Sequence, residues 1–154
     1  MSETRNSPIV SNGKAPVSHA TEYRPRVLVV DDETAIADTI AKILTLSGYP
    51  AIATYDGNDA LETALLNPPE LMITDVALPG MNGIELSIMI KRIFPDCKIV
   101  LFSGQASTSD LIAVAGRSGH HFTLLNKPVP PQDLLTLVGQ HLKANRNGRA
   151  TTAA

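Results

Sequence analysis

The stretch that decides the fold is Val27-Leu28-Val29-Val30-Asp31-Asp32-Glu33, four aliphatic residues followed by three acids. A short apolar run of this kind predicts a strand that is buried on both faces. The next stretch has apolar residues at i, i+4, i+7 and i+8, on one face of a helix: Ile36, Ile40, Ile43 and Leu44. Gly48 follows where a left-handed C-terminal cap would end this helix. The chain therefore begins its folded part with a buried strand and an amphipathic helix.

The same alternation continues to the end of the folded part. Further apolar runs predict strands over 51–55, 71–74, 99–102 and 122–125, of which 51–55 is weaker and suits a sheet edge. Helical stripes fall around 61–65, 86–94, 109–115 and 134–142. Five apolar strands that alternate with five helices predict an α/β fold. Its parallel, doubly wound sheet has helices on both faces and right-handed crossovers, in a three-layer sandwich.

Composition and charge limit the classes of protein to consider. Of the 154 residues, 44% are hydrophobic and 4% aromatic, which suits one aliphatic core and gives few platforms for stacking nucleic-acid bases. Residues 25–142 carry 7 basic and 13 acidic side chains, a net charge of −6, which disfavours nucleic acid as a partner. We predict a folded domain over 25–142, a flexible tail over 1–24 and a flexible basic tail over 143–154.

Signals for export or membrane insertion are missing from the sequence. The single cysteine, Cys97, cannot close an internal disulfide, and no basic start followed by an apolar stretch resembles a signal peptide. No apolar run approaches the roughly 18 to 20 residues that span a bilayer. These features predict a cytoplasmic protein without a membrane partner, in which Cys97 has a structural role.

Polar side chains capable of chemistry follow four of the predicted strands where each one ends. Asp31 and Asp32 follow the first strand, Asp75 the third, Ser103 the fourth and Lys127 the fifth. A single Asp after a strand is most often a helix cap or a turn former. The carboxyl ends of parallel strands share one edge of the sheet, where ligands of such folds bind. Three acids, a hydroxyl and a lysine at matched positions therefore favour a functional site.

Three carboxylates in one crevice raise one another's pKa unless a positive charge neutralises them, and a hard divalent cation is the natural partner. We predict an Mg²⁺ site formed by three carboxylates and one backbone carbonyl, those of Asp31, Asp32, Asp75 and Ala77. The charge of Lys127 and the hydroxyl of Ser103 are then available to phosphate oxygens. Such a site suits phosphoryl transfer in which a carboxylate is the nucleophile and becomes an aspartyl phosphate.

Four segments of the chain belong together when their order and spacing are compared with known families. They are 27–33, Thr74-Asp75-Val76-Ala77-Leu78-Pro79-Gly80-Met81-Asn82-Gly83, Ser103-Gly104 and Lys127-Pro128. From residue 26 to about residue 142 the chain resembles the receiver domain of two-component response regulators, in its stand-alone, CheY-like form. The resemblance implies the following roles: Asp75 as phosphoacceptor, Asp31 and Asp32 as the Mg²⁺ acid pair, Ser103 as switch hydroxyl and Lys127 as phosphate-sensing lysine.

The resemblance also implies a fold and a function. The fold is flavodoxin-like with strand order 2-1-3-4-5, and the Lys127–Pro128 peptide bond is cis. The phosphoryl group comes from a phosphohistidine on a sensor histidine kinase or a histidine phosphotransfer protein. Phosphorylation then changes the affinity for an output protein, which the sequence does not identify. A receiver of this kind is not an enzyme beyond its own autophosphorylation and autodephosphorylation.

Some positions depart from the family pattern. Many receivers have an aromatic switch residue three positions before the lysine, where this chain has Leu124, while Phe122 lies five positions before it. In receivers, the residues two positions after the phosphoacceptor and two after the switch hydroxyl flank the water that attacks the acyl phosphate, and the matching positions here are Ala77 and Gln105. Neither side chain can act as a base, which predicts slow dephosphorylation.

Two other readings remain open at the level of sequence. A haloacid-dehalogenase-like phosphatase also uses a strand-end Asp, Mg²⁺, a hydroxyl and a lysine, but its general acid two residues after the nucleophile would be Ala77 here. A receiver fragment of a longer regulator would give the same sequence. A nucleotide-binding module is disfavoured, because three acids and no glycine-rich loop follow the first strand.

Overall fold

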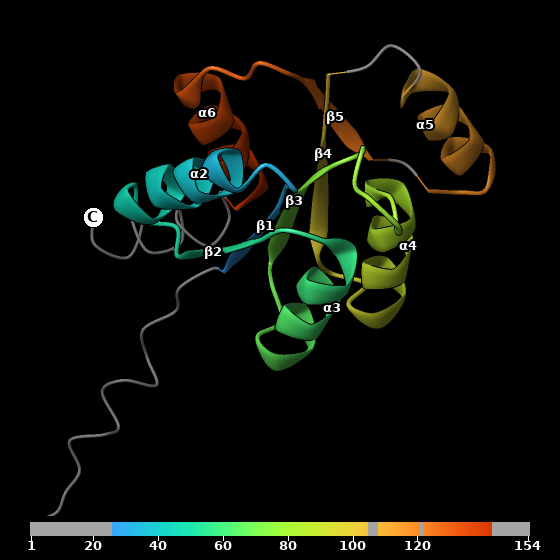
Figure 1. Cartoon of the computed structure of the whole chain (residues 1–154), viewed down its shortest axis with the longest axis horizontal. Helices are drawn as coiled ribbons and strands as arrows, with labels where there is room; N and C mark the ends of the chain where they lie inside the picture. The colour runs from blue at the N-terminus through green and yellow to red at the C-terminus, as the bar shows by residue number, and fades with distance from the viewer. Residues whose placement is uncertain (1–25, 105–107, 121, 143–154) are drawn as a thin grey trace, which may run out of the picture.

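Strands and helices alternate along the chain as the apolar runs and stripes predict (Figure 1). The computed structural model describes residues 26–104, 108–120 and 122–142. Its strands are β1 (Val27–Val30), β2 (Ala51–Thr54), β3 (Leu71–Asp75), β4 (Lys98–Ser103) and β5 (Thr123–Asn126). Its helices are α2 (Thr34–Leu46), α3 (Gly57–Leu66), α4 (Gly83–Ile93), α5 (Thr108–Arg117) and α6 (Pro131–His141). The tails predicted over 1–24 and 143–154 lie outside the described residues.

All five strands form one parallel sheet in the order β2-β1-β3-β4-β5. β1 lies between β2 and β3, so Val27 is aligned with both Ala51 and Leu71. The predicted order 2-1-3-4-5 is therefore confirmed, as is the position of the weakest strand at an edge. In this order the carboxyl ends of β1 and β3 are neighbours, which places the acids that follow them side by side.

The sheet separates two apolar cores, and its central strands face both. Alternate side chains of a strand point to opposite faces, so Val27 and Val29 pack with α2 and α6, whereas Leu28 and Val30 pack with α3 and α4. Figure 1 shows α2 and α6 on one side of the sheet and α3, α4 and α5 on the other. This arrangement confirms the three-layer sandwich and explains why β1 is apolar at every position.

Helix α2, which leads away from the acid pair, ends in a glycine cap. Gly48 has a positive φ of 97°, which a residue with a side chain rarely adopts. The amide of Tyr49 donates to the carbonyl of Leu44 at 2.9 Å, and the amide of Gly48 donates to the carbonyl of Thr45 at 3.1 Å. Together these bonds form a Schellman motif, which confirms the predicted cap.

Some side chains of the predicted helical stripes are not buried. Leu65, near the end of α3, is 57% exposed, and Ile93, the last residue of α4, is 44% exposed. Their neighbours Ala64 and Phe94 pack against the core, so the exposure reflects the side of the helix on which Leu65 and Ile93 lie. None of the helices within the described ranges combines the length and the apolar character that a membrane crossing needs.

Candidate functional site

One edge of the sheet brings together the polar residues that the sequence analysis selected. Asp31 directly follows β1, Asp75 is the last residue of β3, Ser103 is the last residue of β4, and Lys127 directly follows β5. The amide of Lys127 donates to the carbonyl of Ser103 at 2.8 Å, so the ends of β4 and β5 stay paired at this edge. The strand ends therefore fix the backbone positions of these residues.

Three carboxylates form the centre of the site. Asp31, Asp32 and Asp75 each offer an oxygen atom, and these three atoms lie within 4.8 Å of one another. Asp31 is 1% exposed and Asp75 is 7% exposed, whereas Asp32 is exposed to solvent. The cluster thus has two buried acids and one acid at its mouth, an arrangement that is open to an ion from solution.

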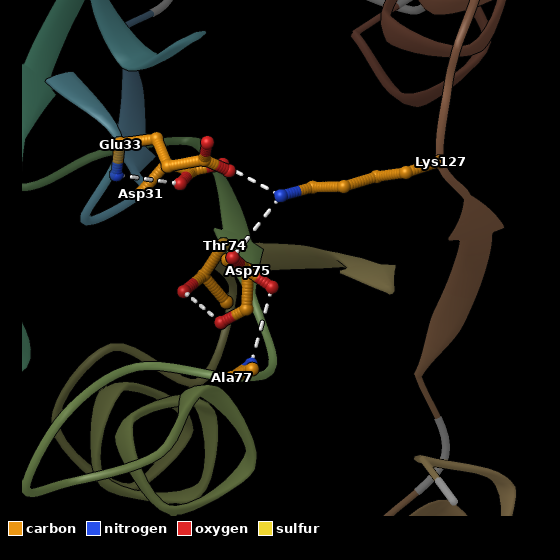
Figure 2. A network of polar contacts seen from close by, with 6 residues as sticks. All are labelled: Asp31, Glu33, Thr74, Asp75, Ala77 and Lys127. Carbon is orange, nitrogen blue, oxygen red and sulfur yellow. Dashed lines mark hydrogen bonds and ion pairs between the residues drawn. The ribbon is translucent and has the colours of Figure 1, made fainter. Parts of the chain in front are cut away.

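Lys127 pairs with both buried acids (Figure 2). Its Nζ lies 3.0 Å from Oδ2 of Asp31 and 3.1 Å from Oδ2 of Asp75. Figure 2 shows the extended lysine side chain reaching across from the β5 end of the sheet toward the two acids. One ammonium therefore links three strand ends that are far apart in the sequence.

Backbone amides hold the second oxygen of each buried acid. Oδ1 of Asp31 accepts a hydrogen bond from the amide of Glu33 at 3.0 Å, and Oδ1 of Asp75 accepts one from the amide of Ala77 at 3.1 Å. Glu33 occupies the N-cap position of α2 without a side-chain cap bond. The turns after β1 and β3 thus orient the two carboxylates while Lys127 binds their other oxygens.

The electrostatics of the site leave negative charge that is only partly compensated. Burial raises the pKa of Asp75, the charge of Asp31 adds to this effect, and the bonds from Lys127 and Ala77 offset it only in part. Burial alone would lower the pKa of Lys127, but its bonds to Asp31 and Asp75 outweigh burial and raise that pKa. A set of oxygen donors with excess negative charge fits a hard divalent cation such as Mg²⁺.

The first residue of α4 presses against the backbone of Asp75. A Cβ atom added at Gly83 would overlap the carbonyl oxygen of Asp75 and approach the Cα atom of Val76 to 3.0 Å. The amide of Gly83 donates to the carbonyl of Val76 at 2.9 Å. The hydroxyl of Thr74 donates to the same Asp75 carbonyl at 3.0 Å (Figure 2).

Thr74 and Gly83 have no predicted role from sequence. A signal for Gly83 is available, because a glycine at the start of a helix directly after a strand-end Asp indicates close approach of two backbone segments. Thr74 gives no such signal, since a β-branched residue is ordinary in a buried strand.

Other residues selected from sequence have the following positions. Ser103 is buried. Ala77 is exposed beside Asp75, and its carbonyl as an Mg²⁺ ligand stays a prediction. The Lys127–Pro128 bond is cis, as predicted. Gln105 lies outside the described residues.

The two candidates for the switch position differ in their environments. Phe122 is half-buried against the core under α3 and α4, and its ring stacks on that of His120 with centroids 6.2 Å apart. Leu124 lies within β5 and is 36% exposed. Neither the burial of Phe122 nor the exposure of Leu124 tests which residue responds to phosphorylation, so the choice between them remains a prediction.

An apolar groove of about 610 Å³ begins beside Lys127. Helix α2 forms one wall, and the segment from Lys127 to the start of α6 forms the other. Its lining includes Ala35 and Thr39 of α2 and, on the other wall, Lys127. The groove therefore shares Lys127 with the acid cluster and extends away from it along α2.

Comparison with known proteins gives one consistent result. Residues 27–139 match the model of the response regulator receiver domain. A CheY-like receiver domain protein from Methanospirillum hungatei is 28% identical, with a TM-score of 0.72 over 82% of this chain and 99% of that one. A receiver domain protein from Clostridium thermocellum is 26% identical, with a TM-score of 0.69 over 79% of this chain and 97% of that one.

Curated relatives of similar sequence are longer proteins. The DNA-binding response regulator MtrA of Mycobacterium leprae is 31% identical over 122 residues, which are 79% of this chain and 53% of the relative. A two-component response regulator of Arabidopsis thaliana is 32% identical over 127 residues, which are 81% of this chain and 20% of the relative. The chain thus spans about half of the MtrA sequence and a fifth of the Arabidopsis one.

Proposed function

Because the chain belongs to the response regulator receiver domain family of two-component systems, we propose that it is a phosphoacceptor switch in which Asp75 becomes phosphorylated. The observation that carries the proposal is the pairing of Asp75 with Lys127 at 3.1 Å within a cluster of three carboxylates. A buried carboxylate of this kind, oriented by an amide and a lysine, is a suitable nucleophile for phosphorus. The proposal treats the chain as a substrate of phosphoryl transfer and not as an enzyme with turnover.

The donor is a phosphohistidine on a sensor histidine kinase or a histidine phosphotransfer protein. A bond forms between a carboxylate oxygen of Asp75 and phosphorus while the P–N bond to the donor imidazole breaks. The imidazole leaves with the electron pair of that bond and takes a proton, and Asp75 becomes an acyl phosphate. The acyl phosphate then changes the affinity of this chain for an output protein.

The donor set fits Mg²⁺, which Asp31, Asp32 and Asp75 would hold with the carbonyl of Ala77. When bound, the ion supplies positive charge that offsets the charge of the phosphoryl oxygens. Lys127 contributes a second positive charge beside Asp75, and the Ser103 hydroxyl would donate to a phosphoryl oxygen. Contact of the new phosphoryl group with Lys127 and Ser103 couples the modification to the ends of β4 and β5.

The apolar groove beside Lys127 suits the protein that delivers the phosphoryl group. A donor histidine that reaches Asp75 must bring its surrounding surface against the exposed residues next to the site, and Ala35 and Thr39 on α2 are exposed there. We assign this groove to the helical surface of the kinase or phosphotransfer protein.

The net charge of −6 over 25–142 supports a protein partner over nucleic acid, although the relative MtrA is described as a DNA-binding response regulator. With one buried cysteine, the proposed location is the cytoplasm.

Phosphorylation by a small donor tests the proposal directly. The chain is incubated with acetyl phosphate and Mg²⁺, and the added mass is located by mass spectrometry. We expect the modification on Asp75 in the wild-type chain, its loss in Asp75→Asn, and its retention in the control Asp96→Asn, in which an exposed acid is changed. Undiminished modification in Asp75→Asn, or equal modification in excess chelator, contradicts the proposal.

A further inference from the structure

Thr74 is a buried hydroxyl in the strand that carries Asp75. It is the residue before Asp75 in β3 and is 0% exposed. Alternation along β3 places its side chain on the same face as Met72, toward an apolar core. A hydroxyl in such surroundings costs free energy unless it is bonded, and a valine would have nearly the same shape without that cost. What the hydroxyl binds is therefore informative.

The bond from Thr74 acts on the backbone of Asp75. Its Oγ1 donates to the Asp75 carbonyl at 3.0 Å and so reaches a backbone atom one residue further along the chain. The bond links no two secondary-structure elements, and its effect is on the conformation of the peptide unit between Asp75 and Val76. That unit is planar, so fixing its carbonyl also fixes the direction in which the chain leaves β3.

The Asp75 carbonyl lies between two constraints. The hydroxyl of Thr74 donates to this carbonyl. Gly83 packs so close to it that a Cβ atom at residue 83 would overlap the carbonyl oxygen. The chain that follows is also held, because the amide of Val76 donates to the carbonyl of Phe102 at 2.9 Å. The next residue is Ala77, whose amide orients Oδ1 of Asp75 at 3.1 Å. A rotation of the Asp75–Val76 peptide unit would therefore move the amide that orients the carboxylate.

We propose that Thr74 is a positioning residue for the phosphoacceptor. Its hydroxyl fixes the Asp75–Val76 peptide unit and thereby maintains the hydrogen bond between the Ala77 amide and the Asp75 carboxylate. This inference rests on the proposed function and adds to it. Without the hydroxyl, the Asp75 carbonyl gains freedom on the Thr74 side. The carboxylate then spends less time in the orientation that binds cation and phosphoryl donor.

The test compares two buried threonines. Thr54, the last residue of β2, is also buried at this edge of the sheet, but its hydroxyl donates to the Val29 carbonyl at 2.9 Å and not to the backbone of Asp75. Thr74→Val and Thr54→Val each remove one buried hydroxyl and keep the shape of the side chain. Thr74→Ala is a second variant without the hydroxyl, and Thr74→Ser restores the hydroxyl without the methyl group.

Three measurements separate positioning from stability. They are the affinity for Mg²⁺ alone by calorimetry, the rate of phosphorylation at saturating acetyl phosphate, and hydrogen exchange of the Ala77 amide in the metal-free protein. We expect Thr74→Val and Thr74→Ala to lose about tenfold in Mg²⁺ affinity and in rate. The acetyl phosphate concentration for half-maximal rate should change little, and the Ala77 amide should exchange faster. Thr74→Ser should recover most of each effect, and Thr54→Val should match the wild-type chain.

Equal behaviour of the Thr74 and Thr54 variants in all three measurements overturns the inference. Loss of folding in both hydroxyl-free Thr74 variants also overturns it, because the hydroxyl then serves stability. A wild-type chain that takes no phosphoryl group contradicts the proposed function instead. In that case Mg²⁺ affinity and exchange of the Ala77 amide still decide the role of Thr74.

Discussion

The ammonium of Lys127 lies 3.0 Å from Oδ2 of Asp31, although 96 positions separate the two residues in the sequence. The same ammonium contacts Asp75 at 3.1 Å, so one lysine partly neutralises both buried acids. A cation that binds the acid cluster therefore meets carboxylates that already have a positive partner. Lys127 and the cation share the same negative charge, and each should influence the binding of the other.

Lys127→Ala should bind Mg²⁺ more tightly than the wild-type chain and be less stable without it. Removal of the ammonium leaves three carboxylates whose repulsion only the cation can offset, and the lost bonds should cost about 2 kcal/mol of unfolding free energy. Calorimetry gives the affinity, and urea unfolding with and without Mg²⁺ gives the stability. Lys98→Ala, which changes an exposed lysine at the start of β4, is the control.

The same variant should separate modification from response. Asp75 and the acid pair remain, so acetyl phosphate should still modify Lys127→Ala, while the contact that carries the phosphoryl group's charge to β5 is lost. Binding to the output protein should then depend little on phosphorylation. A phosphorylation-dependent affinity equal to that of the wild-type chain would contradict this role for Lys127.

Asp75→Asn should be more stable than the wild-type chain at neutral pH in the absence of metal. Burial raises the pKa of Asp75 above its ordinary 3.8, so the folded state binds this proton more tightly than the unfolded chain. The group stabilises the fold below pH 3.8, and that contribution disappears as pH rises through the folded pKa. The stability difference between Asp75→Asn and wild type should therefore shrink as pH falls from 7 to 4. Urea unfolding across this range measures it, and a constant difference would oppose the argument.

The fold and the site differ in how far the sequence predicts them. Apolar runs such as 27–30 and 71–73 predict the strands. Because strand ends share one edge of the sheet, Asp31, Asp75 and Lys127 could be grouped from the order of the strands. Periodicity could not predict the exposure of Ile93, because a helical stripe does not show how far around the helix the core extends. The role of Thr74 could not be predicted from the sequence, because it depends on a bond to the backbone that the residue type does not reveal.

Gly83→Ala should destabilise the protein and impair the site together. Its Cβ would overlap the Asp75 carbonyl, so α4 or the end of β3 must shift, at a cost of about 1 to 3 kcal/mol. Gly104→Ala is the matched control, because a Cβ there approaches the Lys127 side chain no closer than 3.8 Å, an ordinary contact. The midpoint temperature of thermal unfolding and the affinity for Mg²⁺ should both fall for Gly83→Ala, and both should stay near the wild-type values for Gly104→Ala.

Thr39→Arg should block phosphorylation by a protein donor and spare phosphorylation by acetyl phosphate. Thr39 is exposed on α2 and lines the groove beside Lys127, where an arginine side chain would fill space that a helical partner needs. We expect at least about a tenfold loss in transfer from the cognate kinase, equivalent to about 1.4 kcal/mol. Asn67→Arg, at the end of α3, places the same charge outside the groove as a control. Equal losses with both donors would locate the defect in the site itself.

Ala77→Asn should shorten the lifetime of the phosphorylated state. An acyl phosphate is lost when water attacks phosphorus in line, and a nearby polar side chain can hold that water in place. Ala77 lies next to the reacting group, since its amide bonds Oδ1 of Asp75 at 3.1 Å, but its methyl group can neither donate nor accept a hydrogen bond. The residue is exposed, so an asparagine can be accommodated while the amide bond is kept.

The gain from one positioned water is about 1.4 kcal/mol, which corresponds to roughly tenfold faster dephosphorylation. Loss of label from the phosphorylated chain in Mg²⁺ buffer measures the rate, with Ala113→Asn on α5 as the control for an exposed alanine elsewhere. Gln105→Glu, at the other position that the resemblance to receivers assigns to this role, tests the same idea with a carboxylate that can accept the proton. If neither Ala77→Asn nor Gln105→Glu shortens the lifetime, the placement of water does not limit it, and the stability of the phosphorylated state has another origin.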